Sequence, residues 1–231
     1  MPNGAHAAVR VDRQVRIVAV ADTHLFHDEL VVPEGDVFLH AGDMCQGGNL
    51  AELERAVRWI RALPHRTKVI IAGNHDFAFA KNPSEARAMV SDFVYLQDSP
   101  ATIDGVSFWG SPWQPEFNDW AFNLPRGAAL AEKWALIPDR VDVLVTHGPP
   151  HGIGDHGPVT GRLGCEDLLE RVRVVKPRVH FFGHIHQDGG AWQHGETLFV
   201  NATTWECERM PTVIDLDADG ARPALVPPAR K

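Results

Sequence analysis

Side chains that commonly bind metal ions gather at five points of the sequence, each directly after a short apolar run. Asp22 and His24 follow the first run, and His184 and His186 follow the last. In an extended chain, positions i and i+2 point to the same side, so each pair can act on one ligand. Imidazole and carboxylate ligands without thiolates suit Mn, Fe, Zn or Ni rather than a cysteine-based structural zinc site. The groups are Asp22 with His24, Asp43, Asn74 with His75, His147, and His184 with His186.

Polar residues at strand ends can also serve simply to close turns, and this explanation covers Asp22 or Asn74 taken singly. It does not account for five histidines placed beside Gly or Asp at equivalent points. Ligand sites in α/β sheets form outside the carboxyl ends of strands, where loops from several strands converge. The five groups together therefore predict a metal site.

The elements that must position these groups are short, β-branched apolar runs. They predict strands over residues 15–21, 37–41, 68–72, 141–145 and 178–182. Hairpins are expected near residues 104–105 and 194–195, and a last strand over 211–216. We expect one domain over residues 15–217, a flexible arm over 1–14 and a loosely ordered tail over 218–231.

Four helices are expected between these strands. Asn49 with Glu52 is a capping box for a helix from about residue 50 to 63. Pro83 opens a second helix with Asn82 as its N-cap. The other two carry residues 130, 134 and 137, and residues 168, 169 and 172. The alternation of strands and helices favours an α/β fold.

The composition limits the kinds of partner. A net charge of −8 leaves no basic surface for long nucleic acid, although cations can still concentrate positive charge at one point. Three cysteines at unrelated spacings argue against a disulfide framework. No stretch approaches the ~18 consecutive apolar residues of a membrane span, and no signal-peptide pattern is present. We therefore expect a cytoplasmic enzyme without a membrane partner.

The motifs, in their residues and in their order along the chain, resemble those of the calcineurin-like metallophosphoesterase superfamily. The motifs are Asp22-Thr23-His24, Gly42-Asp43, Gly73-Asn74-His75-Asp76, Thr146-His147-Gly148 and Gly183-His184-Ile185-His186. Residues 110–115, 120–127 and 146–150 are similar to the metallophosphoesterase-domain-containing proteins of vertebrate brain and bacteria. Some vertebrate members have glycine where this chain has His184, so this chain keeps a complete ligand set. The resemblance covers residues 15–217 and implies a four-layer α/β/β/α sandwich of two mixed sheets flanked by helices.

The resemblance also implies roles for individual residues. Two divalent ions are implied, with Mn favoured and Fe, Zn, Ni or Co acceptable, and they would lower the pKa of a bridging water that attacks phosphorus. His75 would not be a ligand; it would stabilise the developing charge and protonate the leaving alkoxide. The implied ligands are Asp22, His24 and His186 for one ion, Asn74, His147 and His184 for the other, and Asp43 as the bridge.

Substrate contacts are less clearly indicated. Arg162 could clamp phosphate, because a guanidinium suits phosphate oxygens. The aromatic residues between 109 and 125 could stack on a nucleobase or fill space between helix and sheet, and Trp113 and Phe117 are the ones to test for stacking. The residues assigned to substrate binding are Asn74, His75, His27, Trp113, His151 and Arg162.

The leading function is hydrolysis of small phosphodiesters, and the family resemblance implies 2′,3′- or 3′,5′-cyclic nucleotides. A phosphomonoesterase or protein phosphatase is less favoured, because residues 44–48 replace the Asp-Arg-Gly segment of protein phosphatases. A nuclease would need a basic groove, which is not apparent. A nucleotide-binding protein with weak turnover stays open, as does a homodimer.

Overall fold

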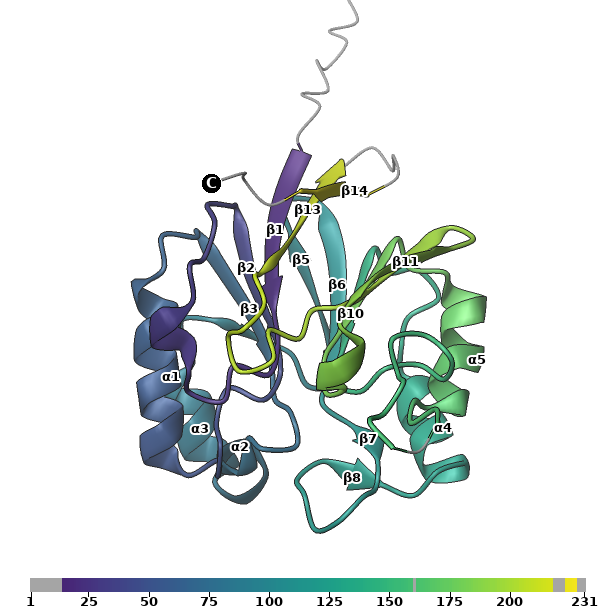
Figure 1. Cartoon of the computed structure of the whole chain (residues 1–231), viewed down its shortest axis with the longest axis horizontal. Helices are drawn as coiled ribbons and strands as arrows, with labels where there is room; N and C mark the ends of the chain where they lie inside the picture. The colour runs from purple at the N-terminus through teal and green to yellow at the C-terminus, as the bar shows by residue number, and fades with distance from the viewer. Residues whose placement is uncertain (1–13, 160, 218–222, 228–231) are drawn as a thin grey trace, which may run out of the picture.

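Two six-stranded sheets face each other with helices on both outer sides, in a computed structural model that describes residues 14–159, 161–217 and 223–227 (Figure 1). The predicted four-layer sandwich is confirmed. The expected arm at residues 1–14 lies outside the described residues except for Gln14, which begins the first strand, and most of the expected tail also lies outside them.

The first sheet has the strand order β14-β13-β1-β2-β3-β4. Strands β1 to β4 run parallel, and β13 and β14 extend the sheet in antiparallel fashion beyond β1. The strands are β1 (Gln14–Val20), β2 (Val37–Ala41), β3 (Thr67–Ile71), β4 (Val94–Tyr95), β13 (Thr212–Asp217) and β14 (Ala224–Val226). Because β14 pairs with β13, the expected loose tail is wrong for residues 224–226.

The second sheet has the strand order β11-β12-β10-β9-β6-β5. Its four central strands run parallel, and the predicted hairpins supply antiparallel strands at both edges. The strands are β5 (Ser99–Ile103), β6 (Val106–Ser111), β9 (Val143–Thr146), β10 (Val179–Phe182), β11 (Gly190–His194) and β12 (Thr197–Asn201). A separate short pair, β7 (Gln114–Pro115) and β8 (Asn123–Leu124), follows β6.

Helices cover the outer face of each sheet, as Figure 1 shows. Helices α1 (Leu50–Ala62), α2 (Phe77–Lys81) and α3 (Pro83–Met89) pack on the first sheet. Helices α4 (Ala128–Trp134) and α5 (Glu166–Val175) pack on the second. Short 3₁₀ turns span His27–Glu29 and His186–Asp188. None of the helices in the described ranges combines the length and apolarity needed to cross a bilayer.

The helices of the structure agree with some of the helix signals in the sequence and differ from others. The side chain of Asn49 accepts a hydrogen bond from the Glu52 N–H, so the capping box is confirmed. Asn82 makes no side-chain cap bond to α3, which differs from the prediction. Ile137 lies beyond the end of α4 and is still buried. Helix α2 was not predicted, because its five residues are too short for a clear periodicity.

The core consists of three apolar layers that alternate along the strands. Side chains such as Ile17 and Leu39 meet Phe181 and Val145 between the two sheets. Neighbouring positions on the strands point outward and pack beneath the helices. Both sheets are therefore buried on both faces, which holds the carboxyl ends of the parallel strands in a fixed relation.

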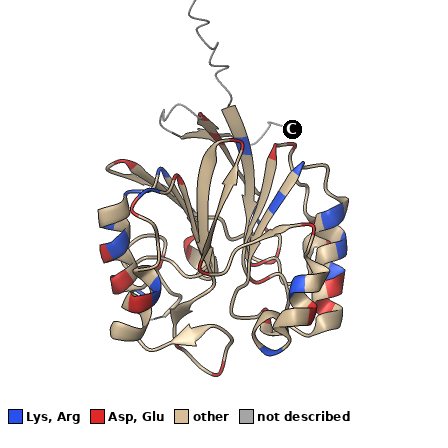
Figure 2. Cartoon of the chain, turned by 180° about the vertical axis from the view of Figure 1, so that it is seen from behind, with Lys and Arg blue, Asp and Glu red and all other residues tan. Residues whose placement is uncertain are grey.

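Charged residues lie mainly on the outer helices. Figure 2 shows lysines and arginines alternating with aspartates and glutamates along these helices. Surface pairs such as Arg61 with Asp92 and Arg58 with Glu54 connect opposite charges. This mixed distribution agrees with the acidic overall composition and offers no concentrated basic face in the part of the chain that is described.

His180, in the middle of β10, predicts an acid-sensitive fold. Its side chain is fully buried, and burial lowers its pKa to about 3. The Thr146 hydroxyl donates to the Gly148 carbonyl, so its oxygen accepts from His180 Nε2 at 2.8 Å, and the ring stays neutral. Below about pH 6.5 this histidine is protonated in the unfolded chain but stays neutral in the folded chain. Its contribution to the free energy of unfolding is therefore fully present above that pH and is lost as the pH falls toward 3.

We expect this one histidine to cost about 2 kcal/mol of unfolding free energy on going from pH 7.5 to pH 5. Urea unfolding of the His180→Gln variant should show a pH dependence weaker by that amount, whatever its stability at pH 7.5. His194→Gln, which changes an exposed histidine, is the control. An unchanged pH dependence in His180→Gln would contradict the assignment.

Candidate metal centre

The candidate ligands lie directly after β1, β2, β3, β9 and β10, at strand ends drawn from both sheets. Several of them adopt left-handed backbone conformations that are unusual for residues with side chains. The φ angles are 55° at Asp22, 43° at His24, 59° at Asp43 and 71° at His184. Such conformations cost about 1–3 kcal/mol each and cluster at functional sites, because the surrounding structure must hold them in place.

A close approach of two loops brings the ligand groups of β2 and β3 together. Gly73, which precedes Asn74, lies so near Asp43 that a Cβ atom there would overlap the Asp43 backbone and carboxylate. A glycine is therefore required at this point of the third strand end. The glycine of the Gly73-Asn74-His75-Asp76 motif is explained by this contact.

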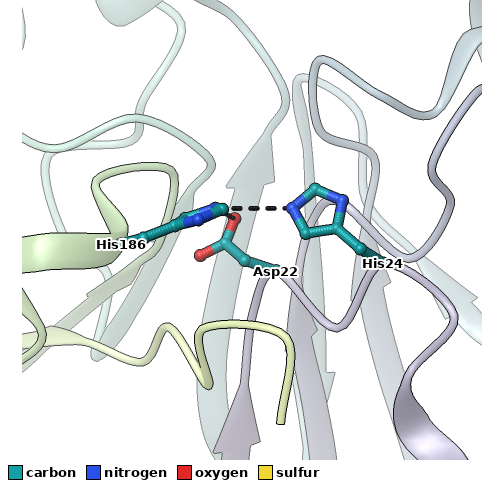
Figure 3. A group of neighbouring side chains, drawn as sticks. All are labelled: Asp22, His24 and His186. Carbon is teal, nitrogen blue, oxygen red and sulfur yellow. Dashed lines mark hydrogen bonds and ion pairs between the residues drawn. The ribbon is translucent and has the colours of Figure 1, made fainter. Parts of the chain in front are cut away.

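Asp22, His24 and His186 form the first cluster, shown in Figure 3. The Nε2 atoms of His24 and His186 are 3.4 Å apart, and His186 Nε2 is 3.8 Å from an Asp22 carboxylate oxygen. His24 donates its Nδ1–H to the Cys45 carbonyl at 3.0 Å, so its Nε2 is the ring nitrogen that faces the cluster. Hydrogen bonding through one ring nitrogen is how proteins orient a metal-binding histidine.

The second cluster lies around His147, which is fully buried. His147 donates its Nδ1–H to the Ala41 carbonyl at 3.0 Å, and its Nε2 is 2.8 Å from Asn74 Oδ1. The His184 ring lies 4.9 Å from the His147 ring, measured between centroids. Asp43, His147 and His184 place their donor atoms within 4.8 Å of one another.

Asp43 lies between the two clusters. Its Oδ2 is 3.3 Å from His147 Nε2 and 3.9 Å from His24 Nε2. Its other oxygen, Oδ1, accepts a hydrogen bond from the His75 backbone N–H at 2.8 Å. One carboxylate oxygen therefore faces donors of both clusters while the second oxygen fixes the orientation of the group.

The carboxylates of the site are held ionised. Burial alone would raise the pKa of Asp43, but the neighbouring His147 and His24 lower it well below the usual range. Burial likewise opposes ionisation of Asp22, yet the hydrogen bond and charge of His186 lower its pKa to about 2. Deprotonated carboxylates are the form that binds cations.

The histidines respond to the same charges in opposite ways. His147 is desolvated, but the charge of Asp43 raises its pKa to about 9. For His184, burial and the neighbouring His147 lower the pKa to about 3, which leaves a neutral imidazole. The site thus contains two buried, ionised carboxylates that attract cations, and imidazole nitrogens surround them. Such a set of ligand atoms suits divalent metal ions.

Asp76 holds the two central loops together, and its role was not foreseen although it belongs to a motif. Its buried carboxylate accepts the N–H groups of Gly73 at 2.8 Å, Asp43 at 2.9 Å and Cys45 at 3.0 Å. These donors come from two loops more than 25 residues apart in the sequence. No local pattern reveals such a contact, because it depends on how β2 and β3 are aligned.

Three predicted substrate contacts are engaged elsewhere. His27 is buried and stacks on Trp59 at 4.6 Å between ring centroids. Trp113 donates its indole N–H to Asp98 at 2.9 Å. Arg162 pairs with the buried Asp155 at 2.8 Å. Each of the three therefore has a partner within the protein, and its contact with substrate stays a prediction.

The other predicted contacts have different surroundings. Asn74 and His75 lie in the site itself, as described above. His151 is partly exposed, and its backbone N–H bonds to the Cys165 carbonyl at 3.0 Å. Two aromatic residues of the 109–125 segment do contact site histidines: Phe117 lies 5.2 Å from His184 and Trp120 lies 4.0 Å from His75, measured between ring centroids.

A pocket of about 360 Å³ opens beside His184. Phe117, Ile185 and Leu163 give it an apolar lining, and Gln187 and Glu116 add polar groups. Arg126 also borders the pocket, but its guanidinium donates to the carbonyl oxygens of Gly164 and Leu163. The pocket therefore fits a ring or an alkyl group better than a second strongly charged group.

Comparisons with known proteins agree on one family. A family model described as calcineurin-like phosphoesterase matches residues 15–188. Metallophosphoesterase domain-containing protein 1 of Homo sapiens is 40% identical, with 91% of this chain and 74% of the relative covered. The 3′,5′-cyclic adenosine monophosphate phosphodiesterase of Escherichia coli K12 is 26% identical, with 84% of this chain and 77% of the relative covered.

Solved structures add a likeness of fold. A dimetal phosphatase from Danio rerio has a TM-score of 0.54 and 12% identity, with 91% of this chain and 98% of that chain covered. A protein of Thermus thermophilus has a TM-score of 0.60 and 12% identity, with 93% of this chain and 99% of that chain covered. At these identities the likeness concerns the two-sheet architecture alone.

Proposed function

Since this chain belongs to the calcineurin-like phosphoesterase family, we propose that it hydrolyses small phosphodiesters at a centre of two divalent metal ions. Cyclic nucleotides, 2′,3′- or 3′,5′-linked, are the leading substrate class. Family membership agrees with the resemblance found in the sequence and supports phosphoric ester hydrolysis in general. The diester preference and the use of two ions are our proposal.

One observation carries the proposal of two ions. Asp43 Oδ2 faces His147 Nε2 at 3.3 Å and His24 Nε2 at 3.9 Å, which are donors of two separate clusters. This position suits a carboxylate shared by two cations. The residues that would hold the first ion are Asp22, His24 and His186, those for the second are Asn74, His147 and His184, and Asp43 would contact both.

Bound divalent ions would supply positive charge for the phosphoryl oxygens and a nucleophilic water at neutral pH, with Mn favoured and Fe, Zn, Ni or Co as alternatives. The protein groups orient the ester around them. The Cys45 and Ala41 carbonyls hold the rings of His24 and His147 in one tautomer. His75 lies beside Asp43 and can give a proton to the leaving oxygen.

The pocket beside His184 supports a diester substrate. A diester carries an organic group on each side of the phosphate, and the apolar wall of Phe117 and Leu163 can receive one of them. A nucleobase would stack on or pack against Phe117, which is 40% exposed. Arg126 donates through both terminal nitrogens to backbone carbonyls, so it does not supply the guanidinium fork that favours a dianionic monoester.

Metal removal and replacement test this function. The purified chain should hydrolyse 2′,3′- or 3′,5′-cyclic nucleotides and bis-p-nitrophenyl phosphate, lose turnover after chelation, and recover it with Mn²⁺. Each of Fe²⁺, Zn²⁺, Ni²⁺ and Co²⁺ should be compared, with bound metal measured by mass spectrometry. Full turnover by chelated protein would exclude a metal-dependent reaction.

The same measurements separate the alternatives. Faster hydrolysis of p-nitrophenyl phosphate than of the diester would favour a phosphomonoesterase. Calorimetric binding of a nucleotide without turnover at any metal would favour a binding protein. One bound ion in a fully active enzyme would contradict the two-ion centre but not the phosphodiesterase activity.

A further inference from the structure

The imidazole of His75 is enclosed by aromatic rings although it lies in a loop. The Trp120 ring lies 4.0 Å from it between centroids, with an angle of 33° between the ring planes. The ring of His24 meets it edge-on at 4.6 Å and 74°. His75 is only partly buried, so these contacts rather than close packing on all sides restrict the rotation of its ring.

A backbone carbonyl fixes one nitrogen of this ring. His75 donates its Nδ1–H to the Gln46 carbonyl at 2.5 Å. The loop that carries this carbonyl is itself clamped, since Glu52 Oε2 accepts the N–H groups of Gln46 at 3.0 Å, Gly47 at 2.8 Å and Gly48 at 2.9 Å. With Nδ1 engaged, Nε2 is the nitrogen of His75 that is left for a substrate.

The segment that carries Trp120 is attached to the same loop as His75. The Ala121 N–H donates to the Asn74 carbonyl at 3.1 Å, which ties the residue after Trp120 to the residue before His75. Gln114, whose side chain is fully buried, donates its Nε2–H to the Ala121 carbonyl at 3.0 Å. The backbone that carries the indole is therefore held beside the loop that carries the imidazole.

We propose that Trp120 is a positioning residue for His75, which holds the imidazole plane so that Nε2 addresses the leaving oxygen of the phosphoester. This inference rests on the proposed function and names the residue on which its proton-transfer step depends. The acid is the imidazolium form of His75, which carries a proton on each ring nitrogen. As the bond between phosphorus and the leaving oxygen breaks, the electron pair stays on oxygen and the Nε2 proton passes to it, which leaves a neutral ring. The other ring proton stays on Nδ1, bonded to Gln46.

Substrates with leaving groups of different basicity distinguish a positioning role from a merely structural one. A structural role would change kcat for both substrates alike. An alkoxide, as in a cyclic nucleotide, needs a proton, whereas p-nitrophenolate leaves without one. We expect Trp120→Ala to lower kcat for the cyclic nucleotide by about 10- to 100-fold, as for a misplaced general acid, with KM little changed. For bis-p-nitrophenyl phosphate the loss should stay within about threefold, and Trp120→Phe should restore most of the difference.

Trp59→Ala is the matched control, because Trp59 also stacks on a histidine, His27, at 4.6 Å and is likewise partly buried. It should leave the ratio of the two kcat values unchanged. In the His75→Ala background, Trp120→Ala should have no further effect on that ratio, since the two residues act as one unit. Bound metal should match the wild-type protein in all these variants.

A measurement independent of activity is the ¹⁵N spectrum of the His75 imidazole in the whole chain. It should report Nδ1 as protonated in every state of the wild-type ring, with Nε2 as the nitrogen that gains and loses a proton, and a mixture of Nδ1–H and Nε2–H tautomers in Trp120→Ala. Wild-type protein that turns over neither substrate would contradict the proposed function, and the spectrum would still decide whether Trp120 holds the ring.

Four results would overturn the inference itself. Equal losses of kcat on both substrates would show that Trp120 acts only by stabilising the fold. A change in KM alone would show that it acts in substrate binding. Loss of bound metal in His75→Ala would make His75 a ligand, as its approach to His24 and Asp43 within 4.8 Å allows. An unchanged ¹⁵N spectrum in Trp120→Ala would show that the Gln46 carbonyl alone suffices.

Discussion

Replacing Asp43 by asparagine is expected to lower kcat/KM for a phosphodiester by at least about 1000-fold. The amide of asparagine is isosteric and keeps one oxygen for the His75 backbone N–H, which in the wild-type protein donates to Asp43 Oδ1 at 2.8 Å. It replaces Oδ2, the atom facing His24 and His147, by an NH₂ group that cannot bind a cation. Asparagine also tolerates the left-handed backbone at this position, where φ is 59°.

Metal content and turnover, measured on the same samples, check this prediction. We expect Asp43→Asn to keep its circular dichroism spectrum and to lose at least one bound metal ion. Asp104→Asn is a matched control, because Asp104 is also left-handed, with φ of 51°, but lies in the β5–β6 hairpin and pairs with Arg66. Wild-type activity with full metal content in Asp43→Asn would refute the shared-carboxylate role.

Asp76→Ala is expected to have the largest effect on stability. Its carboxylate accepts three backbone N–H groups at 2.8–3.0 Å, and the alanine variant leaves these buried donors without partners. Each orphaned donor costs about 1–3 kcal/mol, so we expect a loss on the order of 3–5 kcal/mol in the free energy of unfolding. Activity should fall as well, because the same bonds hold the backbone of Asp43.

Asp76→Asn separates the hydrogen bonds from the charge. Burial and the neighbouring Asp43 raise the pKa of Asp76 to about 6, so the ionised form of this carboxylate is destabilised relative to an exposed one. The amide keeps one acceptor oxygen and removes the charge, and we expect a smaller loss than for alanine. Urea unfolding at pH 7 measures both variants against Asp92→Ala, which breaks an exposed pair with Arg61 and should cost less than about 1 kcal/mol. Equal stability of Asp76→Ala and wild type would show that the loops do not depend on this carboxylate.

Much of the fold followed from local patterns. The strand that precedes Asp22 and the helix capped by Asn49 and Glu52 were predicted because a short apolar run and a capping box act within a few residues. Predictions failed where a local signal was weak or was overridden. The strand at residues 224–226 forms only because β13 offers it an edge, and α2 is too short to show a helical period.

The aromatic and basic residues proved hardest to assign from the sequence. Trp113 and Trp120 lie in the same segment, yet Trp113 bonds to Asp98 and Trp120 lies on His75. Arg162 has the right chemistry for phosphate, but Asp155 engages its guanidinium. The type of a side chain states which partners it can have, while the fold selects among them.

The sequence by itself determined which ligand types stand at the strand ends, because the strand that presents a residue such as His24 or His147 and the turn that follows it are set within a few residues. Only the tertiary structure decided which of these groups meet. Asp43 lies between His24 and His147 because two sheets pack face to face, and Trp120 lies on His75 because Ala121 bonds to Asn74. Such contacts join residues tens to more than a hundred positions apart, and their geometry depends on sheet packing that no local pattern encodes.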